Sequence, residues 1–201
     1  MRRKLIIGLV PALTVLAALA AGVVQASGSD VARAHPSRAS GLGPQGTISP
    51  VTDPLNSGTG TPNGSLTLPA SAGYCPFDVT IAVVTNHEYQ EVFKFSNGQT
   101  VIEIKGRLVL SFTNDSKPAK TLVADSSGAN MITLNPDGSG TQTATGNNWW
   151  GFGTVSQGNI GDGQPGLVLS HGPATIAFAG GYATGYALFG SQENLCKRLA
   201  R

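Results

Sequence analysis

The chain has 201 residues, with 13 basic and 11 acidic side chains, 27 glycines and two cysteines. The first 26 residues hold three of the basic side chains and none of the acidic ones, so the rest of the chain is close to neutral. Because nucleic-acid binding needs a dense basic face that releases counterions from the phosphates, nucleic acid is not an expected partner.

Residues 1–26 have the pattern of a signal peptide. Three basic residues at positions 2–4 precede an apolar stretch that ends near Val24, and cleavage is predicted after Ala26 or at a nearby alanine. An uncleaved membrane anchor is the alternative, since the stretch is about as long as a short transmembrane span. Pro11 and the Ala/Gly-rich end favour cleavage, so we expect a secreted, extracellular protein without stable membrane insertion after cleavage.

Residues 27–72 have the composition of a linker. Of these 46 residues, 26 are Gly, Ser, Thr or Pro. So little apolar surface does not offset the entropy of ordering a backbone, and the segment is predicted to be a flexible tail. Only Leu66 and Leu68, which alternate with polar residues, could add an edge strand at its end.

From residue 73 to residue 201 the sequence predicts one β domain. Short runs rich in β-branched and aromatic residues alternate with turn signals such as Ser96-Asn97-Gly98. This pattern predicts an all-β fold, an antiparallel β-sandwich or barrel of roughly eight to ten short strands. Only residues 191–200 read as helical, with Ser191 as the N-cap. The predicted strand segments are 78–85, 91–95, 100–106, 107–114, 120–126, 130–140, 140–146, 149–155, 166–172, 174–180 and 182–190.

The two cysteines, Cys75 and Cys196, lie at the two edges of this domain. In an exported chain, two cysteines are expected to pair. Free or metal-bound thiols are the alternative, but the sequence has no CxxC or paired-histidine spacing. A disulfide that closes so long a loop stabilises the fold by up to about 5 kcal/mol in a chain-entropy estimate.

Four segments, CPFDVTI, PAKTLVADSSG with LNPDGSGTQTATG, PGLVLSHG and NLCKRLA, resemble a group of exported actinobacterial proteins without an assigned function. The chain keeps Asn114, Lys120 and the turn at 136–139, but has Ala119 where that group usually has glycine. The resemblance covers about residues 75–199. It implies the fold and the export, and it carries no functional residue.

The pair Trp149-Trp150 is the strongest candidate for a binding site. Consecutive strand residues point to opposite faces, so one indole could be exposed when the other is buried. An exposed Trp beside Asn147 and Asn148 could stack on a sugar while the amides bond its hydroxyls. The alternative is that one Trp anchors the core and the other covers a sheet edge.

Candidates for catalysis lack a supporting pattern. A hydrolase would use His87 or His171 as base, Ser170 or Ser111 as nucleophile and Asp125 as orienting group. No nucleophile elbow and no HExxH motif accompany them. Asp137 and Asp162 lie in Gly-rich loops, but one carboxylate per loop falls short of a calcium site, and no metal or cofactor is expected.

The sequence thus favours a secreted, non-enzymatic β-sandwich module with a binding or structural role at or beyond the cell surface. Cell-wall carbohydrate or another protein is the expected kind of partner. A small extracellular hydrolase and a self-assembling envelope or spore-surface component are the alternatives.

Overall fold

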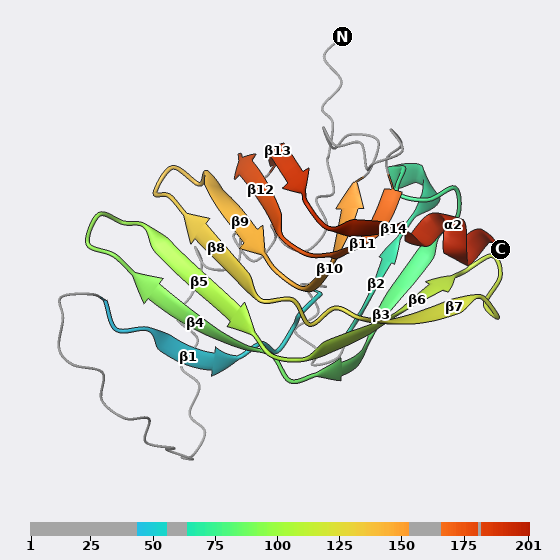
Figure 1. The fold of residues 1–201 in the computed structure, drawn as a ribbon, viewed down its shortest axis with the longest axis horizontal. Coiled ribbons are helices and arrows are strands. Elements are labelled where there is room, and N and C mark those ends of the chain that lie inside the picture. Colours follow the sequence, from blue (N-terminus) through green and yellow to red (C-terminus); the bar gives the residue numbers. More distant parts are fainter. Residues whose placement is uncertain (1–43, 56–63, 153–165, 181) are drawn as a thin grey trace, which may run out of the picture.

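The computed structural model describes residues 44–55, 64–152, 166–180 and 182–201. In these ranges, antiparallel strands form three sheets, and the chain ends in the short helix α2 (Leu195–Ala200) (Figure 1). The antiparallel β fold, the C-terminal helical segment and the Cys75–Cys196 disulfide are confirmed. The predicted signal peptide lies outside the described residues. No helix within the described ranges is long and apolar enough to span a membrane.

The three sheets have seven, four and three strands. Sheet A contains, in spatial order, β1 (Thr47–Pro50), β4 (Tyr89–Lys94), β5 (Thr100–Lys105), β8 (Asn130–Leu134), β9 (Gly140–Ala144), β12 (Ala174–Ala179) and β13 (Tyr182–Leu188). Sheet B contains β2 (Ser65–Leu68), β3 (Val79–Asn86), β6 (Leu108–Asn114) and β7 (Thr121–Asp125), and sheet C contains β10 (Asn147–Phe152), β11 (Gly166–His171) and β14 (Ser191–Asn194).

Most of these strands are halves of longer, bent strands. β3 runs on into β4 and β5 into β6, and their pairing keeps one register through the bend, since Asn86 opposes Leu108 and Tyr89 opposes Lys105. The register is likewise continuous for β7–β8, β9–β10, β11–β12 and β13–β14. Six long strands are thus each bent into two, and these halves make up twelve of the fourteen described strands. Eleven of the fourteen match the predicted segments, and β1, β2 and β14 are additional.

A row of five glycines crosses the bends. Extending the pairing register by one or two residues on each strand places them directly opposite one another on neighbouring strands. Where they meet, the Gly172 N–H donates to the Gly146 carbonyl at 2.8 Å. We call this row the glycine crease; its members are Gly106, Gly128, Gly146, Gly172 and Gly190.

At four of the five crease glycines an added Cβ would clash with neighbouring atoms, and at the fifth, Gly146, the positive φ disfavours a side chain. A Cβ on Gly172 would lie 2.9 Å from the Gly190 Cα, and one on Gly146 would lie 3.4 Å from the Gly128 Cα. A Cβ on Gly190 would collide with the His171 carbonyl group. The backbones approach closely because glycine has no Cβ, and this approach lets the sheet fold sharply along one line.

Beyond the crease, the strands that continue from sheet A separate into sheets B and C. β8 pairs with β9 on one side, whereas their continuations β7 and β10 belong to sheets B and C. Sheets B and C face each other across the main core, which α2 helps to close. Its buried members are Leu55, Leu68, Tyr74, Cys75, Val79, Ile81, Leu108, Leu110, Phe112, Leu167, Leu169, Leu195, Cys196 and Leu199.

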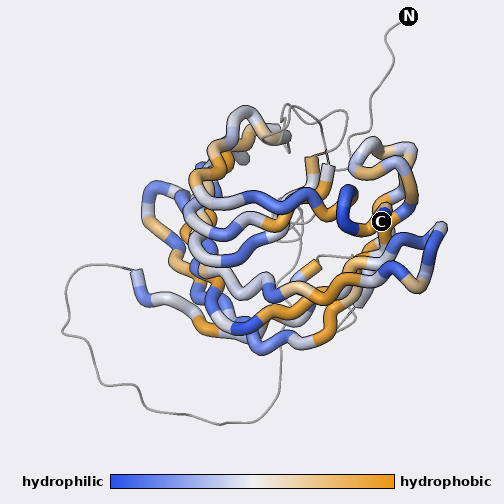
Figure 2. Tube along the Cα trace, turned by 45° about the vertical axis from the view of Figure 1, so that its right-hand side comes forward, coloured by the Kyte–Doolittle hydropathy of each residue, from blue (hydrophilic) through white to orange (hydrophobic). Residues whose placement is uncertain are grey.

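Two smaller apolar clusters lie toward sheet A. One joins Trp150, Phe152 and Val168 of sheet C to Ala174 and Ile176 of sheet A. The other is formed by Ile102, Ile132 and Phe178 within sheet A. Hydrophobic and hydrophilic segments are interspersed along the strands, as expected where one face of a strand is buried (Figure 2).

The disulfide lies in the main core. Cys75 precedes β3 and Cys196 lies in α2, and their Cα atoms are 5.5 Å apart. The bond therefore ties the beginning of the bent strands to the end of the chain, and so fastens sheet B to the helix that follows sheet C.

Parts of the predicted flexible tail belong to the fold. Residues 44–55 provide β1, and Leu55 is fully buried in the main core. Residues 64–72 provide β2, the edge strand expected at Leu66 and Leu68, and a 3-10 turn, Ala70–Ala72. The edge strand at Leu66 and Leu68 agrees with the sequence, whereas β1 and the buried Leu55 lie in a segment predicted to be flexible. The remainder of the predicted tail lies outside the described residues.

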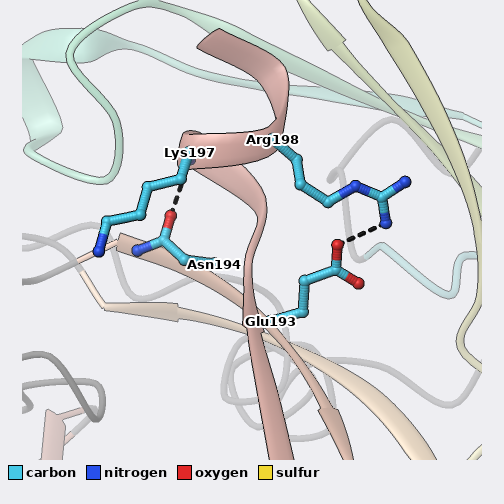
Figure 3. Close-up of polar contacts among 4 residues, drawn as sticks. All are labelled: Glu193, Asn194, Lys197 and Arg198. Carbon is cyan, nitrogen blue, oxygen red and sulfur yellow. Dashed lines mark hydrogen bonds and ion pairs between the residues drawn. The ribbon is translucent and has the colours of Figure 1, made fainter. Parts of the chain in front are cut away.

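The C-terminal helix begins later than predicted. Asn194, not Ser191, is its N-cap, and its side-chain oxygen accepts the Lys197 N–H at 2.9 Å (Figure 3). Residues 191–194 instead form β14, because they pair with β11. Arg198 forms an ion pair with Glu193, and the Asn114 amide donates to the Leu199 carbonyl at 3.1 Å.

Two glycine substitutions on one long strand test the crease. Gly190→Ala should lower the free energy of unfolding by at least about 2 kcal/mol, because its Cβ meets backbone atoms of His171 that cannot move independently. Gly185→Ala is the matched control: no atom lies within 4 Å of a Cβ there, so stability should stay the same or rise by up to about 1 kcal/mol. Urea unfolding midpoints measure both, and equal stabilities would contradict the crease.

Candidate functional site

The two tryptophans of β10 serve two different cores. Trp150 is buried between sheets C and A, and its indole N–H donates to the Ser170 hydroxyl at 2.8 Å. Trp149 is half-buried and packs on the main core, with its ring edge-on to Phe112 at a centroid distance of 6.1 Å. The two indoles point to opposite faces as expected, but both faces are inside the fold.

The neighbouring asparagines are held by other protein groups. Asn148 is buried; its oxygen accepts from the Asn130 amide at 3.0 Å, and its own amide donates to the Thr145 carbonyl at 3.1 Å. Asn147 contacts the His171 ring, with 2.8 Å between Oδ1 and Nδ1. Trp149, Trp150, Asn147 and Asn148 therefore do not form an exposed sugar-stacking platform, because sheet C folds back over sheet A.

The residues of the hydrolase alternative are scattered. His171 is exposed, whereas the adjacent Ser170 points to the opposite face and donates to the Asn148 carbonyl at 3.2 Å. His87 is exposed at the bend between sheets A and B, and the Asp125 carboxylate accepts from the Ser127 N–H. Within the described residues, no base, hydroxyl and carboxylate come together among these candidates.

The turn that carries Asp137 is held by its own hydrogen bonds. The Asp137 carboxylate accepts from the Ser139 N–H at 2.9 Å and from the Ser139 hydroxyl at 2.7 Å. These bonds lower the pKa of Asp137. Asp162 lies outside the described residues, and the described part of the chain has no group of three or more potential metal ligands.

An uncharged surface covers four adjacent strands on the outer side of sheet A. One row across these strands runs through Met131, Thr143, Thr175 and Ala187, and the next row runs through Thr133, Thr141, Ala177 and Gly185. We call these eight residues the threonine face. Their inward-pointing neighbours, such as Ile132, are buried.

The threonine face offers hydroxyl and methyl groups without charge. Thr141 and Met131 are exposed, and a shallow depression is lined by Thr175, Ala177, Gly185, Tyr186 and Ala187. The described outward positions of β8, β9, β12 and β13 carry no charged side chain, whereas Glu91 and Glu103 face outward on β4 and β5. The alternating threonines of residues 141–145 are the signal in the sequence, but only the register shows that they form one surface.

Glu88 occupies the place in the crease row where a further glycine would follow Gly106. Only 8% of Glu88 is exposed, and burial raises the pKa of its carboxyl group to about 7. Its N–H donates to the Asn86 side chain and its carbonyl accepts from the Val51 N–H, both at 3.0 Å. Its backbone is thus fixed, while its side chain is a buried acid that ionises near neutral pH.

Comparisons of the chain with protein-family models, with curated proteins and with solved structures find no match. Function is therefore argued from the geometry of the surfaces and from the chemistry of the side chains on them.

Glu88 makes stability depend on pH. Since the pKa is about 7 in the fold and 4.5 ordinarily, the fold favours the protonated acid. The contribution of Glu88 to the free energy of unfolding is therefore highest below pH 4.5. It falls by roughly 3 kcal/mol in total as the pH rises from 4.5 through 7, because the fold then has to release the proton of Glu88. Glu88→Gln should remove this loss, whereas Glu103→Gln, an outward position, should keep it. Urea unfolding between pH 4 and about 8 measures the difference, and the same pH profile for wild type and Glu88→Gln would refute the assignment.

Proposed function

We propose that this protein is a secreted, non-enzymatic binding module whose binding surface is the threonine face. Three features support a location outside the cytoplasm: the disulfide, the signal-like pattern of residues 1–26 and the resemblance to exported actinobacterial proteins. An extracellular address agrees with the fold, since a disulfide in the main core persists in an oxidising compartment.

The observation that carries the binding role is the absence of charge on the described positions of a four-strand surface rich in threonine. Threonine presents a hydroxyl that donates and accepts, beside a methyl group that makes apolar contact. Adjacent strands lie about 4.8 Å apart, so the hydroxyls form a regular array. Such a surface suits a neutral polymer that itself alternates hydroxyls and C–H patches, and cell-wall carbohydrate has this chemistry.

A rigid, preformed surface favours binding in a second way. The threonines project from central strands of sheet A, and the inner faces of these strands carry the buried residues Ile132, Ile176 and Phe178. Because the backbone is held on both sides by neighbouring strands, little conformational entropy is lost when a ligand binds. The hydrolase alternative has no comparable arrangement among the described residues.

Retention on insoluble polysaccharides tests this function. The purified protein should sediment with cell-wall sacculi, cellulose or chitin, and added salt should have little effect because the surface is uncharged. Thr143→Lys, at the centre of the threonine face, should weaken retention at least about tenfold, since a charge replaces a hydroxyl contact. Thr121→Lys is the matched control, because Thr121 is an exposed threonine of sheet B.

Two results would count against the proposal. One is that none of these polysaccharides retains the wild-type protein. The other is that Thr143→Lys and Thr121→Lys bind as strongly as wild type, which would place any binding on a different surface.

A further inference from the structure

Among the described strands, β13 is an edge strand of sheet A (Figure 1), and it carries Gly185 and Ala187 of the threonine face. Within the described part of the chain it pairs only with β12. The Phe189 N–H donates to the Pro173 carbonyl at 2.9 Å, so alternate backbone groups of Gly185 and Ala187 also point toward β12. The N–H and C=O groups of Tyr186 and Leu188 therefore point outward.

This edge has little protection against pairing with another chain. Soluble proteins usually protect free edges with charged residues, above all lysine, or with proline. β13 has none of these, whereas the opposite edge of sheet A ends in Pro50. Among the described residues, the Leu188 carbonyl accepts only from the Gln192 amide, at 3.4 Å, which is a weak hydrogen bond that a partner strand can replace.

A protruding side chain and a depression lie on the same strand. Phe189 is 72% exposed, the highest value among the large hydrophobic side chains described. Four residues along the strand and on the same face, Gly185 lies in the shallow depression with Thr175 and Ala177. No atom lies within 4 Å of a Cβ placed on Gly185.

We propose that two copies of this protein associate through antiparallel pairing of their β13 strands, with Ala187 on the two-fold axis. In this register, Tyr186 of each copy exchanges backbone hydrogen bonds with Leu188 of the other. Phe189 of each copy lies opposite Gly185 of the other, over the depression. The contact is self-complementary, as a two-fold interface requires.

The register follows from the side chains. With Tyr186 on the axis, Phe189 of one copy would lie opposite Ala183 of the other. With Leu188 on the axis, Phe189 would lie opposite Ala187 of the other copy. Only the Ala187 axis brings the most exposed ring over the residue without a side chain. On the inner face, the same register pairs Tyr186 with Leu188, both of which are only half-buried in the single chain.

This association does not rest on the proposed function. It covers the side of the threonine face that contains Gly185 and Ala187, while Met131, Thr141 and Thr143 lie two or three strands further in and stay accessible. A protein that binds carbohydrate as a monomer would refute the association alone, and a dimer that binds no polysaccharide would refute the binding function alone.

Sedimentation of the purified protein over a range of concentrations tests the interface. Wild type should form a dimer. Gly185→Val places a side chain in the depression, where a Cβ has no atom within 4 Å, and Phe189→Ala removes the ring, so each should raise the dimer dissociation constant at least about tenfold. Val123→Ala is the matched control; it removes a 65% exposed side chain from β7 of sheet B and should leave the dimer intact. Circular dichroism confirms that each variant is folded.

Cross-linking tests the register. A pair that does not exchange hydrogen bonds has Cα atoms about 4.5 Å apart, which a disulfide spans. Ala187→Cys should therefore form an intermolecular disulfide in air, whereas Thr175→Cys, one strand further in, should not. A wild-type protein that is monomeric at every concentration would overturn the proposal. A dimer unaffected by Gly185→Val and Phe189→Ala would overturn it as well.

Discussion

The close approach of backbones along the glycine crease is the constraint on which the fold depends. At Gly106, Gly128, Gly172 and Gly190 the neighbouring strands leave no space for a Cβ, and Gly106, Gly146 and Gly172 adopt positive φ values that other residues rarely take. A continuous sheet of long strands would otherwise twist gently. Folding it along one line separates sheets B and C from sheet A and allows them to enclose the main core.

The crease also explains why the Trp pair is internal. Sheet C packs on sheet B with one face and on sheet A with the other, so Trp149 and Trp150 each meet a core. The consecutive apolar residues Leu167, Val168 and Leu169 belong to the same strand β11 and are all buried, which is typical of a strand covered on both faces. Alternation along a strand predicts which residues share a face, but not whether the second face is covered.

The strands and the disulfide could be predicted from the sequence. The strands follow from local residue patterns, and the disulfide follows from the presence of two cysteines in the chain. All eleven predicted strand segments correspond to observed strands, since β-branched runs and turn residues lie close together in the chain. The crease and the threonine face could not be predicted, because both depend on which residues face each other across strands far apart in sequence. Leu55 was missed for a related reason: one leucine among Pro, Ser and Thr gives no periodicity.

The crease carries a cost that the disulfide offsets. Glu88, Ser126 and Gln142 are buried, and among the described residues neither the Ser126 hydroxyl nor the Gln142 side-chain oxygen has a hydrogen-bond partner. An unpaired buried polar group costs about 1–3 kcal/mol, which is similar in size to the stabilisation of up to about 5 kcal/mol expected from closing so long a loop. Cys75 and Cys196 fasten the half of the fold that holds the larger core. The disulfide thus anchors the half of the fold that lies away from the outer surface and the edge strand of sheet A.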